Sequence, residues 1–257
     1  MYKIMSTNVL GKYSKHAAED NITEARMRTL AECIEFYAPD SVGVQEYGRQ
    51  NQKFFPEYLP QKYQFVEFGQ SWISTLYNSE RLVLEHSTCR KLTTSSGQNY
   101  CFTVAVFSDK VNGSLAYIHG NLHLEYKDKE TRIIDAAEIN AEIKELYKNN
   151  EAYRAVPLLI TGDYNASLLK EPEVFSTIAG DYHIKSAVLV ADSAEDGQAT
   201  YHGSVGVPRG AGEGIDHVLV SCDTVHVTHH NIIKEDDYPK ILDASDHYPL
   251  LVEFQPQ

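Results

Sequence analysis

The segment Ser245–Phe254, SDHYPLLVEF, places an acid and an imidazole side by side immediately before an apolar run. Asp246 and His247 therefore lie where a loop enters a strand, with hydrophobic residues behind them to anchor that strand in a core. If the strand is extended through this point, the two side chains face opposite sides of the sheet. One such pair is a weak signal, because a single histidine is more often a core residue with satisfied hydrogen bonds than a functional group.

Similar polar side chains stand beside five other apolar runs of the chain. They are Asn8, Glu46, Asn121 with His123, Asp163 with Asn165, and Asp216. Carboxylate oxygens are the ligands that Mg²⁺ prefers, and carboxylate and imidazole groups exchange protons with reacting atoms. If the ends of these runs meet at one edge of the fold, the set predicts a hydrolytic metal site.

Glu46 ends the short apolar strand VGVQE and is the first candidate metal ligand. Mg²⁺ is usually held by one or two carboxylates together with water and phosphate oxygens of the substrate, so a lone glutamate meets that need. Asp246 is a second candidate if the loop bends, and Asn8 could hydrogen-bond a metal-bound water. Taken singly, Glu46 is more simply a helix-capping or surface residue, and Asn8 an ordinary polar strand end.

Asp163 and Asn165 follow the predicted strand 156–161, and period-two alternation would place them on the same side. The carboxylate could accept a proton while the amide donates hydrogen bonds to a phosphate under attack. An ordinary Asx turn, which Gly162 makes plausible, is the competing interpretation.

The histidines need partners to act in chemistry, because a neighbouring acceptor decides which ring nitrogen carries the proton. Asp216 heads a neighbouring strand and is the candidate partner of His247. Asn121 and His123 share a face of their strand, and His123 could donate to a phosphate oxygen or to a leaving group. Asn121 and Arg209, the single Lys or Arg of a glycine-rich loop, are candidate substrate-binding residues, although a solvated loop arginine is the simpler interpretation.

The composition is that of an acidic globular protein. The chain has 257 residues, 42% of them hydrophobic, and a formal net charge of -13. A polyanion such as duplex DNA would meet repulsion, and nucleic-acid binders usually carry a basic stripe that is missing here. The charge therefore favours a small or uncharged-bodied substrate, without excluding a local basic patch.

Nothing in the sequence indicates a membrane body or a disulfide framework. The mean hydropathy is -0.37, and no apolar run approaches the ~18–20 residues that span a bilayer. The four cysteines lack CxxC spacing, so we interpret them as small hydrophobes. The first residues lead into strand-like sequence rather than a signal peptide, so we expect a soluble protein, and we take it as a monomer. It would be cytoplasmic or, if a leader precedes this chain, secreted or periplasmic.

The chain alternates strand-like and helix-like segments, as expected for one domain over residues 1–257. Periodicity predicts helices between Asn21 and Pro39 and over 50–59, 129–149 and 171–179. Strands are predicted over 1–10, 41–45, 63–68, 71–78, 81–92, 101–108, 114–121, 156–162, 215–220 and 224–230, before the C-terminal strand. Helices at each end of a β-rich middle suggest two packed sheets with helices outside.

Six motifs, taken together and in order, resemble the endonuclease/exonuclease/phosphatase superfamily. They are STNV at 6–9, GVQE at 43–46, GNLHL at 120–124, GDYNA at 162–166, GIDHV at 214–218 and SDHYP at 245–249. The helix carrying Arg132 and the segment Thr200–Gly203 also look like that family. The chain departs from it at Leu122, where threonine is common, and at Thr7, where an aromatic residue is frequent. Neither change removes a functional group.

The resemblance implies a four-layer α/β/β/α sandwich of two mixed sheets packed face to face, and phosphoester hydrolysis that depends on Mg²⁺ or Mn²⁺. It makes Glu46 the main metal ligand, with Asn8 and Asp246 near the cation. Asp163 would orient or deprotonate the attacking water, and Asn165 and His123 would hold phosphate oxygens. His247, fixed by Asp216, would stabilise the pentavalent transition state.

Three functions are compatible with these motifs. We favour a phosphodiesterase or phosphatase acting on a small or lipid-derived phosphate. An endonuclease or exonuclease acting on DNA or RNA is the alternative, and a positive groove beside the site would favour it. A non-catalytic binding module on the same fold is a third, but its signature would be the loss of Glu46, Asp163 or His247, and all three are present.

Overall fold

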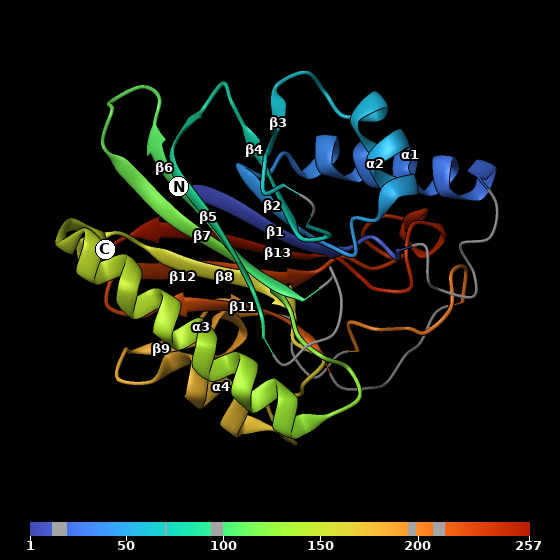
Figure 1. Ribbon diagram of the computed structural model, residues 1–257. Helices are drawn as coiled ribbons and strands as arrows, with labels where there is room; N and C mark the ends of the chain where they lie inside the picture. Colours follow the sequence, from blue (N-terminus) through green and yellow to red (C-terminus); the bar gives the residue numbers. More distant parts are fainter. Residues whose placement is uncertain (12–19, 70, 94–99, 195–198, 208–213) are drawn as a thin grey trace.

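Two β-sheets lie face to face, with helices on the outer side of each, in the computed structural model of the chain (Figure 1). The structure describes residues 1–11, 20–69, 71–93, 100–194, 199–207 and 214–257. The expected four-layer sandwich of two mixed sheets is confirmed.

In the described part of the chain, the first sheet has seven strands in the order β10-β12-β13-β1-β2-β4-β3. Their bounds are β10 Ser193–Ala194, β12 Val225–Ile232, β13 Leu250–Pro256, β1 Tyr2–Asn8, β2 Ser41–Gln45, β4 Ser74–Asn78 and β3 Tyr63–Val66. In the centre, β1 runs parallel to β2 and antiparallel to β13. The predicted strand 71–78 begins only at Ser74, because the Ser71 hydroxyl accepts a hydrogen bond from the Ile73 amide and forms a turn first.

The second sheet has six strands among the residues that the structure describes, in the order β5-β6-β7-β8-β11-β9. Their bounds are β5 Leu82–Lys91, β6 Cys101–Asp109, β7 Leu115–His123, β8 Leu158–Asp163, β11 Asp216–Ser221 and β9 Ile184–Ser186. The hairpins β5-β6 and β6-β7 are antiparallel, as their spacing predicted, whereas β7 and β8 are parallel.

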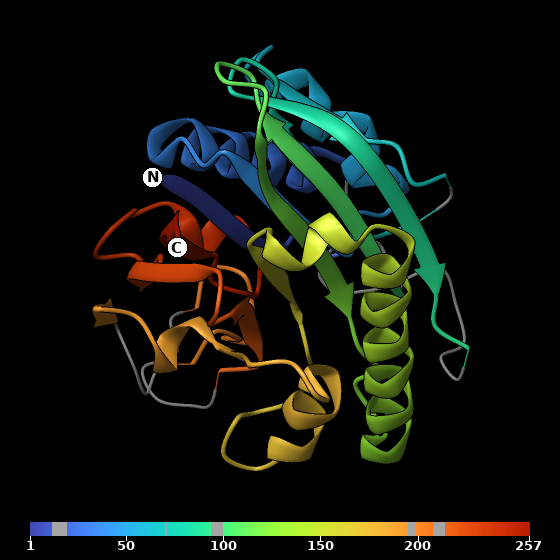
Figure 2. The same cartoon turned by 90° about the vertical axis from the view of Figure 1, so that its left-hand side faces the viewer.

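Four α-helices cover the outer faces in the described part of the chain. They are α1 Asp20–Tyr37, α2 Arg49–Tyr58, α3 Lys129–Asn149 and α4 Pro172–Ala179. Three short 3₁₀ helices, η1 Glu151–Ala155, η2 Ala187–Leu189 and η3 Ile241–Asp243, join the larger elements. Figure 2 shows α3 running along the outer side of the six-stranded sheet. None of the described helices is long and apolar enough to cross a membrane.

Strand alternation divides the buried side chains of the second sheet between two hydrophobic cores. On β6, Ala105 and Phe107 belong to the core shared with the first sheet, and Val104 and Val106 belong to the core that includes α3. A strand buried on both faces reads as a continuous apolar run, which is why β6 and β8 were recognisable in the sequence.

The strand pairing brings the polar strand ends to one end of the sandwich. Asn8 pairs with Gln45, the residue before Glu46, in the parallel ladder of β1 and β2. In the other sheet, Asp163 pairs with both His123 and Asp216. Because β1 and β2 pack on β7 and β8, the two groups of strand ends face each other.

Candidate active site

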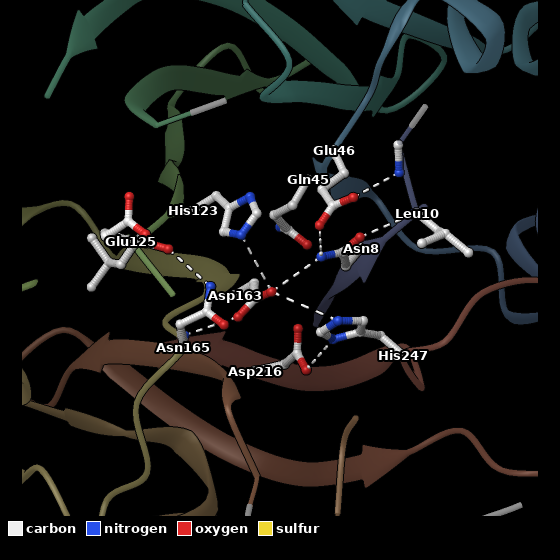
Figure 3. A network of polar contacts seen from close by, with 12 residues as sticks. Asn8, Leu10, Gln45, Glu46, His123, Glu125, Asp163, Asn165, Asp216 and His247 are labelled. Atoms are coloured by element: carbon white, nitrogen blue, oxygen red, sulfur yellow. Dashed lines mark hydrogen bonds and ion pairs between the residues drawn. The ribbon is translucent and has the colours of Figure 1, made fainter. Parts of the chain in front are cut away.

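Asp163 lies at the centre of the polar cluster, at the end of β8 (Figure 3). One of its oxygens, Oδ2, accepts a hydrogen bond of 3.1 Å from Asn8 Nδ2 and lies 3.5 Å from His123 Nε2 and 3.8 Å from His247 Nε2. Burial and the nearby charge of Asp216 raise the pKa of Asp163 to about 6. A carboxyl group with that pKa is largely ionised near neutral pH and can accept a proton.

His247 forms a dyad with Asp216, the partner expected from the sequence. His247 Nδ1 lies 2.9 Å from Asp216 Oδ2, which leaves Nε2 facing Asp163. Burial opposes a positive charge on this ring, but Asp216, Asp163 and Asp246 outweigh burial and raise the pKa of His247 to about 10. The ring of Tyr201 packs against His247, with centroids 4.8 Å apart. At neutral pH the His247 ring is therefore an imidazolium, and its Nε2 faces Asp163.

Glu46 follows β2 and is held from two sides. The Gly11 amide donates to Oε2 at 2.7 Å, and Asn8 Nδ2 donates to Oε1 at 3.2 Å. Burial opposes the negative charge, but His123, the Gly11 amide and His247 outweigh it, so the pKa of Glu46 is lowered. Asn8 thus links the carboxylates of Glu46 and Asp163 through one amide nitrogen.

Left-handed backbone conformations gather at this site. Leu10, Glu46 and Asn165 have φ angles of 55°, 57° and 46°, which non-glycine residues rarely adopt. Such strain persists only where the surroundings enforce it, and it clusters at functional sites. Glu46 directly follows β2 and Asn165 lies two residues beyond the end of β8, so the left-handed backbone turns the chain at two of the candidate site residues.

The strained backbone of Asn165 changes its expected position. β8 ends at Asp163, so the period-two argument for a shared face does not apply. Instead, the Asn165 amide donates to Asp163 Oδ1 at 2.9 Å, forming the Asx turn that was the competing interpretation. The side chain donates from Nδ2 to the Leu124 carbonyl at 2.9 Å, which leaves the second hydrogen of that nitrogen for another acceptor.

Asp246 lies beside the cluster, 9% exposed. The Ser245 hydroxyl donates to the Asn8 carbonyl at 2.6 Å, and the His202 amide donates to the Asp246 carbonyl at 2.9 Å. The first bond attaches the segment before β13 to the end of β1, and the second attaches it to the segment that contains His202. The proposed ligand role of Asp246 depended on a bend of this loop. That bend is present, because residues 244–249 precede β13 and do not extend it.

Asn121 differs from its expected role in substrate binding. Its Oδ1 accepts from Gln45 Nε2 at 2.7 Å, and its Nδ2 donates to the Ser74 carbonyl at 2.8 Å and the Val44 carbonyl at 3.2 Å. The side chain is 0% exposed and joins the two sheets. It has no exposed surface to offer a substrate, so we correct its role to a structural one. Arg209 lies outside the described residues.

Two residues of the site region, Arg26 and Thr200, were given no individual function from the sequence. Arg26 lies on α1 beside Met27 and is buried. Burial lowers its pKa to about 10, which still leaves it a cation at neutral pH. The Thr200 hydroxyl accepts from the amides of Ile215 and Asp216, both at 3.0 Å, and so fixes the start of β11. A charged residue within an apolar helical stripe was the signal that could have identified Arg26.

The donor atoms of the cluster fit a hard divalent cation. Among the described residues, Asp163, Asp216 and His247 form the one group whose ligand atoms lie within 4.8 Å of one another. His247 Nδ1 is already engaged by Asp216 in that group. Each oxygen of Glu46 accepts one hydrogen bond, which leaves lone pairs for a metal. Oxygen ligands of this kind suit Mg²⁺ and Mn²⁺.

Comparison with known proteins identifies the fold. No family model and no curated protein matches the sequence. A solved mannosyl-6-phosphatase of Bacteroides thetaiotaomicron VPI-5482 is 18% identical, with a TM-score of 0.80, and 99% of this chain and 100% of that one are covered. An endonuclease/exonuclease/phosphatase of Bacteroides vulgatus is 22% identical, with a TM-score of 0.81, and covers 100% of this chain and 99% of its own.

A third match comes from a eukaryote. TDP2 of D. rerio, solved with a single-stranded DNA product, is 17% identical, with a TM-score of 0.76, and the match covers 99% of this chain and 98% of that one. Similarity at these levels of identity establishes the fold. The resemblance indicated by the six sequence motifs is confirmed at that level, and this chain has the fold of the endonuclease/exonuclease/phosphatase family proteins.

Proposed function

We propose that the chain is a divalent-metal-dependent phosphoester hydrolase, a phosphodiesterase or phosphatase, that acts as a monomer on a small or lipid-derived phosphate. The observation that carries the proposal is the convergence of Asn8, His123 and His247 on one oxygen of Asp163. The fold shared with a mannosyl-6-phosphatase supports the reaction class. The net charge of -13 supports a small substrate over a nucleic acid.

The attacking water is activated by Asp163. Asn8 and the Asn165 amide each bind one of its oxygens, so the carboxylate is held in one orientation. With a pKa of about 6, it accepts the proton of a water that attacks phosphorus in line with the leaving group. Removal of such a proton acceptor typically lowers the rate by about 10²–10⁴-fold.

The negative charge that develops on the phosphoryl group is met by histidine donors. His247 stays protonated because Asp216 lies 2.9 Å from Nδ1, so its Nε2 donates to a phosphoryl oxygen of the transition state. His123 and the free hydrogen of Asn165 Nδ2 hold the other oxygens. Glu46 and Asp246 would hold the cation, with Asn8 beside it, and the bound cation supplies Lewis-acid polarisation of the phosphoryl group.

The test is hydrolysis of bis-p-nitrophenyl phosphate with Mg²⁺ or Mn²⁺. We expect E46Q, D163N and H247A to lose activity, and EDTA to stop the wild-type reaction. H183A is the matched control, because His183 is exposed and lies beside Cys222, at the end of β11 opposite Asp216. Full activity in D163N, or turnover in excess chelator, would refute the mechanism.

A substrate panel separates the proposed class from the alternatives. It should contain sugar phosphates, inositol phosphates, sphingomyelin, and single- and double-stranded nucleic acids. Preference for nucleic acid by kcat/KM would establish the nuclease alternative. If the protein binds a member of the panel but hydrolyses none of them, the non-catalytic binding module is established. Gel filtration with light scattering measures the molar mass in solution and so tests whether the protein is a monomer.

A further inference from the structure

Two buried polar side chains reach the site from behind, from the helices that cover the first sheet. Arg26 belongs to α1 and Asn51 to α2, and each is 2% exposed. Every hydrogen bond that the structure gives to their side chains ends on a backbone carbonyl oxygen. We call Arg26 and Asn51 the bracing pair.

Arg26 joins two segments that are far apart in the sequence. Its Nε donates to the Ala244 carbonyl at 2.9 Å, and its Nη2 donates to the carbonyls of Val9 and Leu10, the latter at 3.1 Å. Ala244 stands two residues before Asp246, and Val9 directly follows Asn8. One planar guanidinium therefore sets the distance between the segments that carry those two side chains.

Asn51 extends the same connection to the third segment. Its Nδ2 lies 3.2 Å from the Val9 carbonyl, 3.3 Å from the Leu10 carbonyl and 3.2 Å from the Glu46 carbonyl. Leu10 and Glu46 are two of the residues with a left-handed backbone. The bracing pair thus binds the carbonyls of two of the three left-handed residues described at this site, Leu10 and Glu46.

The charge of Arg26 acts on the same groups. Its guanidinium lies close enough to Glu46 and Asp246 to interact electrostatically with both carboxylates. It attracts both carboxylates, while its hydrogen bonds are made to backbone carbonyls rather than to the carboxylates. A lysine would keep the charge but could not reach both segments with a planar fork.

We propose that Arg26 and Asn51 are positioning residues that set the spacing of Glu46, Asp246 and Asn8 and thereby the affinity of the site for a divalent cation. This inference rests on the proposed function. Both side chains are buried and bond to backbone carbonyls, so their effect passes through the backbone that carries the ligands. Groups that orient metal ligands typically change metal affinity by about 10–100-fold when they are replaced.

The experiment measures Mn²⁺ dissociation constants of metal-free R26K and N51A by electron paramagnetic resonance. We expect each constant to rise by about 10–100-fold relative to wild type. Activity should recover toward the wild-type value at saturating Mn²⁺, with little change in the KM for bis-p-nitrophenyl phosphate. R28K on α1 and E57Q on α2 are the matched controls, because both side chains are exposed, and they should bind Mn²⁺ as wild type does.

A purely structural role would lower the melting temperature and leave the dissociation constant unchanged, and that result in either folded variant overturns the inference. If R26K does not fold, N51A decides, because it retains the guanidinium. The proposed function fails separately, when the wild-type protein itself neither binds Mn²⁺ nor hydrolyses the diester. If the wild-type protein hydrolyses the diester but folded N51A binds Mn²⁺ with unaltered affinity, only the inference about the bracing pair is rejected and the proposed function stands.

Discussion

Replacing Asp216 with asparagine should move the alkaline limb of the pH–rate profile, because Asp216 keeps His247 charged. The two groups are 2.9 Å apart, and together with Asp163 and Asp246 this acid raises the pKa of His247 to about 10. Each charge is delocalised over its group, so we take about 4 Å between the charge centres; at that separation and an effective dielectric constant of about 20 the pair interacts by about 4 kcal/mol, or about three pKa units. In D216N the pKa of His247 should therefore fall to about 7.

The sign of the effect follows from the direction of the shift. A raised histidine pKa keeps the imidazolium present up to high pH, so wild-type kcat/KM should persist until the pH approaches 10. In D216N the charged fraction of His247 at pH 8.5 falls about 30-fold, and activity should fall with it. The acid limb should also move to lower pH, because Asp216 contributes to the raised pKa of Asp163.

The assay is kcat/KM for bis-p-nitrophenyl phosphate between pH 5 and 10, supported by NMR titration of the His247 ring. D223N is the matched control, because Asp223 pairs with the exposed His183 at 3.0 Å, and it should leave the profile unchanged. A folded D216N enzyme whose alkaline limb coincides with that of wild type would show that His247 does not act as an imidazolium.

Three further predictions concern stability. G43A should lower the free energy of unfolding by about 1–3 kcal/mol in urea titrations, because a Cβ there would lie 1.9 Å from Thr161 Oγ1 and 2.7 Å from Asn121 Oδ1; wild-type stability would contradict this close approach of the sheets. Burial lowers the pKa of His119 to about 3 and of His217 to about 4. Below about pH 6.5 the unfolded chain therefore binds protons at these histidines that the native state does not bind. Stability should then be full above pH 6.5 and fall below it by up to about 1.4 kcal/mol per pH unit for each histidine; in urea titrations at pH 7, 6 and 5, H119Q should flatten the dependence, and an equal slope would argue against this origin. R132M should lower the free energy of unfolding by about 3 kcal/mol, because it leaves Glu171 without the guanidinium that lies 2.7 Å away; a melting temperature within 1 °C of wild type would contradict this loss of stability.

Most of the fold could be predicted because its signals are local. The helix over 129–149 and the strand over 41–45 have the bounds that periodicity indicated. The short strands β9 and β10 were not predicted, since segments of three and two residues carry no detectable period. Pairing, rather than sequence pattern, makes them strands.

The candidate site was predicted to the extent that polar residues mark strand ends. His247 and Asp216 lie together as expected, as do Asp163 and His123. The alternation used to place Asp163 and Asn165 on one face does not reach residue 165, because β8 ends at Asp163 and Asn165 has a left-handed backbone. Asn121 could not be assigned correctly, since its surroundings depend on how closely Gly43 lets the opposite sheet approach.

The sequence by itself determined which residues stand at the ends of apolar runs, because alternation and capping depend on near neighbours along the chain. Only the tertiary structure decided that these ends meet on Asp163, and that Arg26 and Asn51 support them from behind. Those contacts join residues up to 218 positions apart. They follow from the packing of two sheets and their covering helices, which no local pattern specifies.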